Sequence, residues 1–198
     1  TLASTGAVAL ANTAAGGVNN TEVVWLTAAG PGSIPMTNNM VDPWIVSRNA
    51  DQFLKYDATN GLQLITQGTS PANRLEPLAA VTTLDGTLGA AATDGTAILD
   101  LGLASGTQTL GANLDVHALR YLRDINVSAD GQFNRITIRS GGIILSGNNA
   151  GTLNPDLYFG TAGDGTGEAL FFARQNTAQI NGRIFASHLT KFGSGFLN

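Results

Sequence analysis

Short runs of alternating apolar and polar residues, each bounded by turn-forming residues, dominate the second half of the chain. After Asn113 they read in order LDVHALRYL, INVSA, FNRITIRS, GGIILSG, DLYFG, EALFFAR, AQINGRIFA and LTKFGSGFL. They follow one another at separations of about eight to thirteen residues, the spacing of strands in a sandwich, a barrel or a solenoid. Helical periodicity is poor, because Gly, Asn and Thr interrupt nearly every window. The pattern therefore predicts an all-β chain.

Two kinds of strand can be distinguished by their pattern. Ile136 and Ile138 alternate with polar residues, which predicts a strand with one face in a core and one in water. In GGIILSG and EALFFAR the apolar residues are adjacent. Such a run fits either a strand covered on both faces or residues that turn at the corner of a coil.

The first half of the chain is less regular. Strands are expected in TEVVWLTAAG (residues 21–30) and PWIVSR (43–48), and DQFLKYDATNGLQLIT (51–66) predicts two strands around an Asn-Gly turn. Residues 67–80 predict a loop or a short helical excursion, and LEPLAAVTTL (75–84) is the best helical segment of the chain. This arrangement is typical of a solenoid that carries a lateral insertion.

The turns alone do not separate a sandwich from a solenoid, because Asn-Gly and Asp-Gly pairs, which close hairpins, recur along the chain. The composition favours the solenoid. Charged residues make up only 12% and Gly numbers 25, which suits stacked coils with tight corners and outer ladders of Thr, Asn and Ser.

Charge and residue content exclude several classes of partner. The net charge of -4 provides no basic surface for nucleic acid, and the two lysines, Lys55 and Lys191, lie far apart in sequence. Cys is absent, so neither a disulfide framework nor a thiolate metal site can form. No apolar run is long enough to span a bilayer, and the start lacks both Met and a basic leader. Residues 1–198 are therefore expected to be one continuous β-solenoid segment, excised from or repeated within a longer chain.

Candidate catalytic residues are few. The densest charged group combines Asp100, Asp115, Asp124 and Asp130 with Arg120, Arg123, Arg135 and Arg139. Paired carboxylates with arginines serve β-helical polysaccharide lyases and hydrolases, but ion pairs at the corners of outward strands are the favoured interpretation. His117 and His188 stand apart from each other and from any metal-ligand spacing. The loop GTAGDGTGEA (160–169) has neither the lysine of a phosphate loop nor the recurring Asp of a calcium repeat, so no cofactor or metal is expected.

Aromatic residues are the candidates for glycan contact. Trp25 and Trp44, with Tyr56 and Tyr158, would form a stacking strip if exposed, since sugar faces pack on aromatic rings. In a chain with only 7% aromatic residues, packing in a core or a flap is the simpler interpretation.

The closing segment LTKFGSGFLN resembles the autotransporter-associated β-strand repeat, also called the passenger-associated transport repeat. The positions of its Leu-Thr-Lys-x-Gly-x-Gly-x-Leu pattern are occupied by Leu189, Thr190, Lys191, Gly193, Gly195 and Leu197. The order of the upstream motifs LDVHALRYL, NRITIRSGGIILSGN and GEALFFARQNTAQINGRI, preceded by PWIVSRNADQFLKYDATNGLQLI, is also similar to long surface proteins of bacteria such as verrucomicrobia and planctomycetes. The resemblance implies a right-handed parallel β-helix of a secreted or surface-displayed protein. It also implies that Leu189 points inward, that the two glycines form a tight corner and that Phe196 or Leu197 begins the next coil.

We therefore expect a non-enzymatic, structural or adhesive protein that is extracellular or on the cell surface of a bacterium. Its β-helix is expected to continue into further repeats or to associate end to end with other copies into fibres or filaments. A surface glycan is the further candidate partner. The alternatives are a polysaccharide-degrading β-helix enzyme and a carbohydrate-binding module that uses Trp25 and Trp44.

Overall fold

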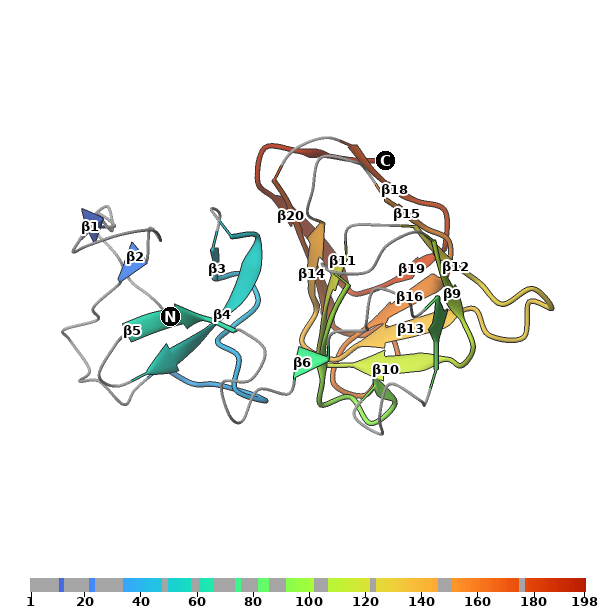
Figure 1. Ribbon diagram of the computed structural model, residues 1–198, viewed down its shortest axis with the longest axis horizontal. Coiled ribbons are helices and arrows are strands. Elements are labelled where there is room, and N and C mark those ends of the chain that lie inside the picture. The colour runs from blue at the N-terminus through green and yellow to red at the C-terminus, as the bar shows by residue number, and fades with distance from the viewer. Residues whose placement is uncertain are drawn as a thin grey trace.

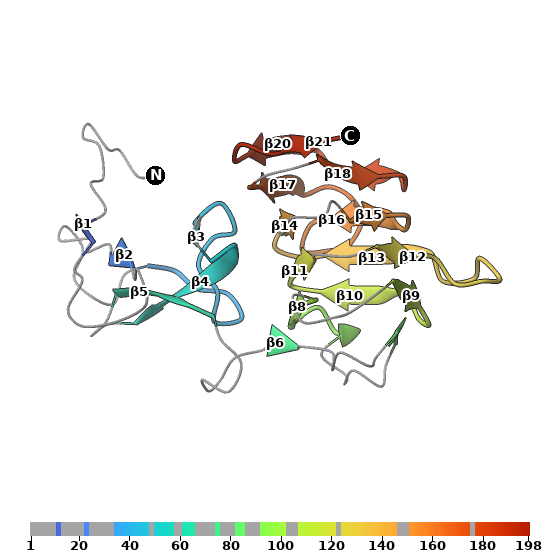
Figure 2. The ribbon, with the colours of Figure 1, turned by 45° about the horizontal axis from the view of Figure 1, so that its top comes forward.

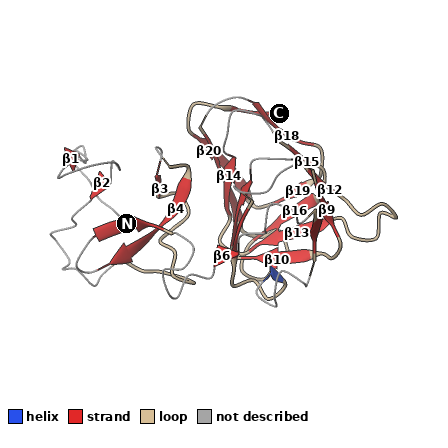
Figure 3. Ribbon diagram, viewed as in Figure 1, coloured by secondary structure: helices blue, strands red, loops and turns tan. Residues whose placement is uncertain are grey.

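The computed structural model describes a stack of parallel strands with a small antiparallel sheet beside it (Figure 1). The residues that it describes are 11–12, 22–23, 34–47, 50–57, 61–65, 74–75, 82–85, 92–101, 107–121, 124–145, 151–174 and 177–198. Strands and loops make up nearly all of them (Figure 3), with a short 3₁₀ turn at Ala92. Within these ranges no helix is long and apolar enough to cross a membrane.

Three parallel sheets form the stack, and the chain passes from sheet I to sheet II to sheet III in each turn (Figure 2). Sheet I consists of β6 (Arg74–Leu75), β8 (Ile98–Asp100), β11 (Ala118–Tyr121), β14 (Gly142–Leu145), β17 (Glu168–Ala173) and β20 (His188–Phe192). Sheet II consists of β7 (Thr83–Leu84), β9 (Gln108–Leu110), β12 (Ile125–Asn126), β15 (Thr152–Leu153), β18 (Thr177–Ile180) and β21 (Phe196–Leu197). Sheet III consists of β10 (Leu114–Val116), β13 (Arg135–Ile138), β16 (Asp156–Phe159) and β19 (Ile184–Phe185).

Each strand pairs in parallel with the equivalent strand of the next coil. Ile98 lies beside Ala118, 20 residues later, and Gly142 lies beside Leu170, 28 residues later. Because hairpins would join neighbouring strands in antiparallel fashion, these pairings exclude a sandwich. The fold is a parallel β-helix, as predicted from the sequence.

Inward-facing residues of the coils form continuous columns. In sheet I, Leu119, Ile143 and Phe171 lie one above another, and all three are buried. In sheet III, Ile136 and Leu157 pair in the same way and are fully buried. Strand alternation thus sends every second side chain into one shared core. Burial of each such Leu, Ile or Phe side chain stabilises the fold by about 1.5–3 kcal/mol.

A small antiparallel sheet covers the outer face of sheet I. This lateral sheet consists of β3 (Val46–Ser47), β4 (Gln52–Asp57) and β5 (Gly61–Leu64). Apolar side chains of the lateral sheet and its adjoining loops pack against outward-facing residues of sheet I in one cluster. The members of this cluster are Met40, Phe53, Ile65, Ile98, Ala118, Ile144 and Phe172. The adjacent apolar residues in GGIILSG and EALFFAR are therefore explained by coverage on both faces. The antiparallel strand pair predicted in residues 51–66 is confirmed. In the described residues the lateral sheet precedes β6, the first described strand of the stack, and so lies before the described coils rather than between them.

Polar contacts also hold the lateral sheet against the coils. Arg120 donates from Nε to the carbonyl oxygen of Asp51 at 2.5 Å and from Nη1 to Asp100 Oδ1 at 2.7 Å. Arg174 follows β17, two coils further along the stack. Its Nη1 forms an ion pair with Asp51 Oδ2 at 3.4 Å. Asp51 is buried, so its charge requires such partners. These contacts tie one turn of the lateral sheet to several coils at once.

Asparagine side chains of successive coils are hydrogen-bonded to one another along sheet II. Asn154 Nδ2 donates to Asn126 Oδ1 at 2.5 Å, and Asn181 Nδ2 donates to Asn154 Oδ1 at 2.8 Å. At the following position Gly182 approaches the previous coil so closely that a Cβ there would lie 1.8 Å from the Pro155 carbonyl oxygen. Equivalent positions of successive coils are therefore in direct contact outside the core as well as inside it.

Several local predictions have other outcomes. Within residues 43–48 only Val46–Ser47 is a strand, and Pro43 and Trp44 lie in a turn. The predicted helix at 75–84 is wrong at both of its described ends, because Leu75 belongs to β6 and Thr83–Leu84 forms β7. In residues 21–30 only β2 (Glu22–Val23) is described, paired with β1 (Ala11–Asn12). Apart from β6, residues 67–80 lie outside the described residues.

We predict that Ile144→Ala lowers the free energy of unfolding by about 2–5 kcal/mol, because it leaves a cavity between sheet I and the lateral sheet. Ile144 is fully buried, although its side chain points away from the coil interior. The matched control is Ile184→Ala, which removes the same atoms from a side chain that is 36% exposed and should cost less than about 1.5 kcal/mol. Urea unfolding followed by circular dichroism measures both. Equal losses for the two variants would contradict coverage of sheet I by the lateral sheet.

Candidate functional site

The last coil holds the residues of the repeat motif. In β20, Leu189 lies beside Ala169 and Lys191 beside Phe171. Since Ala169 and Phe171 belong to the core, Leu189 and Lys191 occupy inward positions, whereas Thr190 lies on the outer face. The Leu189 side chain is nevertheless 48% exposed, because β20 is the outermost strand of sheet I in the described chain.

The two motif glycines form the corner after β20. Gly193 has a φ of +84°, and a Cβ there would lie 2.3 Å from the carbonyl oxygen of Ala173, so glycine is required. The Gly195 N–H donates to the same oxygen at 2.8 Å. Lys191 Nζ donates to the Gly193 carbonyl oxygen at 2.7 Å, so its amino group is held within its own coil. The corner leads into β21, where Leu197 packs against the core.

An apolar surface lies at this end of the stack. We call it the end face; it is formed by β19, β20 and β21, the outermost strands of the three sheets (Figure 2). Ile184 and Leu189 occupy inward positions on these strands and are 36% and 48% exposed. Phe196 is 68% exposed, but it precedes the core-facing Leu197 and therefore points to the outer face of sheet II. The outer edges of the three strands pair with no other strand in the part of the chain that is described. Strand edges of this kind are templates for further strands.

A groove runs along the corner where sheet III passes into sheet I. Two hollows of about 450 and 430 Å³ share five lining residues and so form one space, the lateral groove; the shared residues are Asp42, Pro43, Arg139, Ser140 and Thr161. The first hollow extends to Thr37, Asp94 and His117, and the second to Trp44, Thr166 and Glu168. One wall is the loop that precedes β3, and the other is made of the corners of successive coils.

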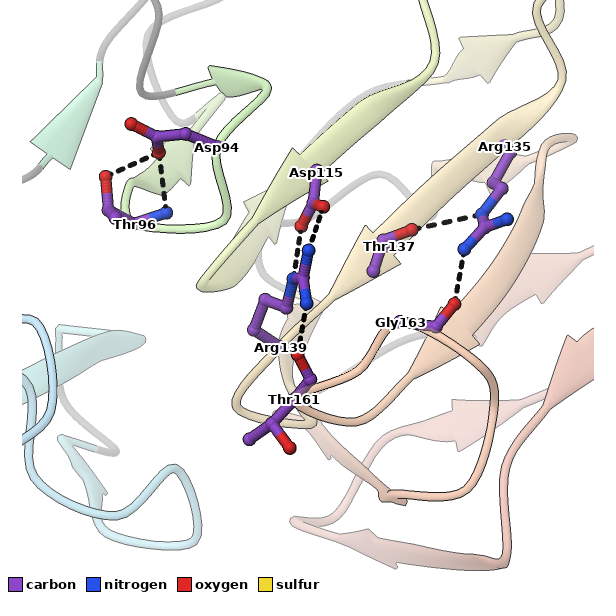
Figure 4. Close-up of polar contacts among 8 residues, drawn as sticks. All are labelled: Asp94, Thr96, Asp115, Arg135, Thr137, Arg139, Thr161 and Gly163. Carbon is purple, nitrogen blue, oxygen red and sulfur yellow. Dashed lines mark hydrogen bonds and ion pairs between the residues drawn. The ribbon is translucent and has the colours of Figure 1, made fainter.

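Polar side chains build the coil wall of this groove (Figure 4). Arg139 donates from Nε to Asp115 Oδ1 at 2.7 Å, from Nη2 to Asp115 Oδ2 at 2.5 Å, and from Nη1 to the Thr161 carbonyl oxygen. These hydrogen bonds, which Asp115 accepts, raise the pKa of Arg139 above its ordinary value. The charge of Arg139 is therefore neutralised by a partner on the previous coil, and its side chain is fixed in place.

The pKa values of two titratable groups in the first hollow, His117 and Asp94, are shifted by their surroundings. His117 is buried, which lowers the pKa of its ring, and a hydrogen bond to the backbone of Thr37 opposes that shift. This bond connects the loop wall to the coil wall. Asp94 accepts hydrogen bonds from the N–H of Thr96 at 2.9 Å and from its hydroxyl at 2.6 Å, and they lower the pKa of Asp94 (Figure 4). A catalytic general acid needs a raised pKa, so Asp94 does not suit that role.

The four aromatic candidates have different environments. Trp44 is 50% exposed and lines the second hollow. Trp25 lies outside the described residues. Tyr56 is buried within the lateral sheet, and Tyr158 stacks on Phe185 with ring centroids 4.2 Å apart. Of these four, Trp44 is the residue that the structure places on a groove.

The charged residues singled out in the sequence form ion pairs and hydrogen bonds within the coils. Asp100 and Asp115 form ion pairs with Arg120 and Arg139, as predicted. Arg135 donates to Thr137 Oγ1 at 3.1 Å (Figure 4). Its guanidinium carbon also lies 4.0 Å from the centroid of the Tyr158 ring. Asp124 accepts a hydrogen bond from the Thr152 N–H at 2.7 Å, and Asp130 accepts one from the Ser128 hydroxyl at 2.6 Å. Arg123 lies outside the described residues.

The remaining candidate residues from the sequence have local structural contacts. The loop at 160–169 connects β16 to β17, as predicted, and Asp164 accepts hydrogen bonds from the backbone and hydroxyl of Thr166. The ring of His188 is exposed and lies 3.2 Å from the Ser187 hydroxyl. Over the described ranges no group of three or more His, Asp or Glu side chains is placed to hold a metal ion.

Sequence reasoning missed Asp42, Asp94, Thr161 and Glu168 as groove residues. They come from four separate loops or strand ends, and no spacing in the sequence relates them. The available signal was the polar and Pro-containing segment directly before Trp44.

Comparisons of the chain with protein-family models, with curated proteins and with solved structures find no match. The likeness to the autotransporter-associated repeat therefore rests on the sequence motifs alone.

We predict that folding stability decreases as the pH falls below about 6.5, the ordinary pKa of histidine. Because the folded pKa of His117 is lowered, the unfolded chain takes up the proton first, and the neutral ring stabilises the fold fully only above that pH. The loss continues until the pH reaches the folded pKa, and each pKa unit of difference corresponds to about 1.4 kcal/mol. Asp42, Asp94 and Arg139 line the same hollow. The lowered pKa of Asp94 and the raised pKa of Arg139 keep these two groups charged over this range.

Urea midpoints at pH values from 7.5 down to 5 measure this effect. His117→Gln should flatten the profile in that window, and His188→Gln, at an exposed site, should leave it unchanged. A slope that survives in His117→Gln would show that another group is responsible.

Proposed function

We propose that the chain is a non-enzymatic structural segment of an extracellular or cell-surface bacterial protein. In this role its coils stack into a rod, and the rod is lengthened by further coils at the end face. The observation that carries the proposal is the stack itself, in which three parallel sheets enclose one continuous apolar core. At the end face, the outer edges of the strands lie beside the apolar side chains of Ile184 and Leu189.

The stack is suited to a mechanical role. Backbone ladders run along the axis in three sheets, and the core is continuous from Leu84 in sheet II to Ala178 near the end face. The asparagine column of Asn126, Asn154 and Asn181 adds side-chain hydrogen bonds in the same direction. A load along the axis is therefore carried by many hydrogen bonds and by one apolar core.

The occupant that fits the end face is the first coil of a second copy. A docking coil must present strand edges to sheets I, II and III at once, which another β-helix of the same cross-section can do. In this chain sheets I and II begin with β6 and β7 at the opposite end of the stack (Figure 2). Such a contact joins two different surfaces, so it does not close and generates an open filament.

Lys191 is compatible with this contact. Its inward position would place a charge against the next coil, but its amino group is bound to the carbonyl oxygen of Gly193. The aliphatic part of its side chain then remains available for packing, as lysine side chains commonly provide at apolar surfaces.

We predict that the protein lengthens into rods or filaments as its concentration rises. Replacing Ile184 and Leu189 together by Gln should weaken the association at least about tenfold, because it removes two apolar side chains at inward positions from the contact. Sedimentation velocity over a range of concentrations gives the association constant, and negative-stain electron microscopy gives the shape of the particles.

The matched control is Trp44→Gln, which alters an equally exposed apolar side chain beside the stack and should leave association unchanged. A wild-type protein that stays a single short rod at high concentration would count against assembly through the end face.

A further inference from the structure

We propose that the lateral groove binds a neutral oligosaccharide, with Trp44 as the surface on which a sugar ring stacks. The groove lies beside the stack and the end face lies at its tip, so this inference does not depend on the assembly of the chain.

The exposure of Trp44 is the first observation. Half of its side chain is accessible, although apolar partners are close at hand in the clusters of the lateral sheet. It lines a concave space together with Pro43 and Leu170. An indole that is exposed on the wall of a groove offers a flat apolar face, and the C–H face of a sugar ring is a complementary surface.

The polar lining is the second observation. Around the indole lie the side chains of Asp42, Ser140, Thr161, Thr166 and Glu168. Asp42, Thr161, Thr166 and Glu168 are exposed residues. Glu168 Oε1 accepts a hydrogen bond from the Thr190 hydroxyl at 2.6 Å, and the Thr166 hydroxyl donates to Asp164 at 2.6 Å. Carboxylates accept hydrogen bonds from sugar hydroxyls, and hydroxyl groups both donate and accept them. A ring with alternating apolar faces and hydroxyl edges satisfies both parts of this lining.

The charge of the groove favours a neutral ligand over an acidic one. Asp42, Asp94 and Glu168 line it, whereas its one arginine, Arg139, is held by both oxygens of Asp115. The lowered pKa of Asp94 keeps that carboxylate ionised at neutral pH. A uronic acid or a sulfated sugar would therefore meet uncompensated negative charge, which disfavours its binding.

The length of the groove favours a chain of sugars over a single ring. Its coil wall runs from Asp94, before β8, through His117, before β11, and Ser140, before β14, to Glu168 at the start of β17. These corners belong to successive coils, and strands of a sheet lie about 4.8 Å apart, so the wall is about 14 Å long. Several sugar units can lie along it parallel to the axis of the stack.

The experiment is calorimetric titration of the whole chain with neutral oligosaccharides. Cello-oligosaccharides and chito-oligosaccharides of one to six units serve as probes, and an oligogalacturonide of four units serves as the acidic comparison. We expect affinity to rise from one to about three units and the acidic probe to bind at least about tenfold more weakly than its best neutral counterpart.

Two variants assign the binding to the groove. Trp44→Ala should weaken the best neutral ligand at least about tenfold, because the stacking surface is lost. Asp42→Asn should reduce the discrimination against the acidic probe by about two- to threefold, since it removes one of the repelling charges. Phe196→Ala removes a more exposed aromatic side chain outside the groove and should leave the affinity unchanged. Circular dichroism verifies that each variant is folded.

Several results would overturn the inference. They are the absence of binding by every neutral probe, unchanged affinity in Trp44→Ala, or tighter binding of the acidic probe. Binding of an oligolysine peptide in place of the sugars would identify the groove as a site for a basic peptide. Release of reducing ends from the neutral probes would identify a hydrolase rather than a binding site.

Discussion

The structure depends on the parallel stacking of equivalent positions, which places each side chain of a coil above its counterpart in the coil before. This constraint makes residue types repeat down columns. Leu119, Ile143 and Phe171 share one inward column, and Asn126, Asn154 and Asn181 share one at a corner. On the outer face, Tyr158 and Phe185 stack with an interplanar angle of 15°. A column of like residues thus provides apolar packing, amide hydrogen bonds or ring stacking through the same parallel register. An unlike residue in such a column would leave its neighbours without a matching partner.

The exceptions to a polar outer surface show where the coils meet other parts of the chain. Ile144 and Phe172 lie in an outward column of sheet I and are buried, because the lateral sheet covers them. Thr137 of sheet III is also buried, and the loop at Gly163 lies against it. The lateral sheet leaves the adjoining corner open, since its loop wall stands off from the coil wall there and is connected to it through His117. The lateral sheet and the loop before it, which bury the outer face of sheet I, therefore also form one wall of the lateral groove.

Residue periodicity was sufficient to predict the coils, because alternation in a strand depends only on neighbouring residues. The runs after Asn113 and the antiparallel pair in residues 51–66 are found. Of the two explanations left open for the adjacent apolar residues of GGIILSG and EALFFAR, the structure shows coverage on both faces. The helix expected at 75–84 failed at its described ends, since its spacing of leucines and alanines lacks a clear period and pairing with the next coil decides the structure of β6 and β7. The groove could not be predicted for a related reason. Asp115 and Arg139 are 24 residues apart, and Trp44, in the turn before β3, is far in sequence from Glu168. Only the register of the coils and the packing of the loop before β3 bring these residues to one corner.

The directions of the two candidate surfaces determine how they can act together. The end face is perpendicular to the axis, whereas the lateral groove runs parallel to it along the side of the stack. Addition of coils at the end face therefore does not cover Trp44 or Asp42. If copies associate end to end as proposed, each added copy brings another groove at a fixed spacing along the same rod. A polymer that engages one groove has its next segment held near the following one, so that weak single contacts become a strong multivalent attachment. A rigid rod with weak lateral sites is thus a physically consistent design for adhesion, because its stiffness keeps the spacing constant and its ends remain free for growth.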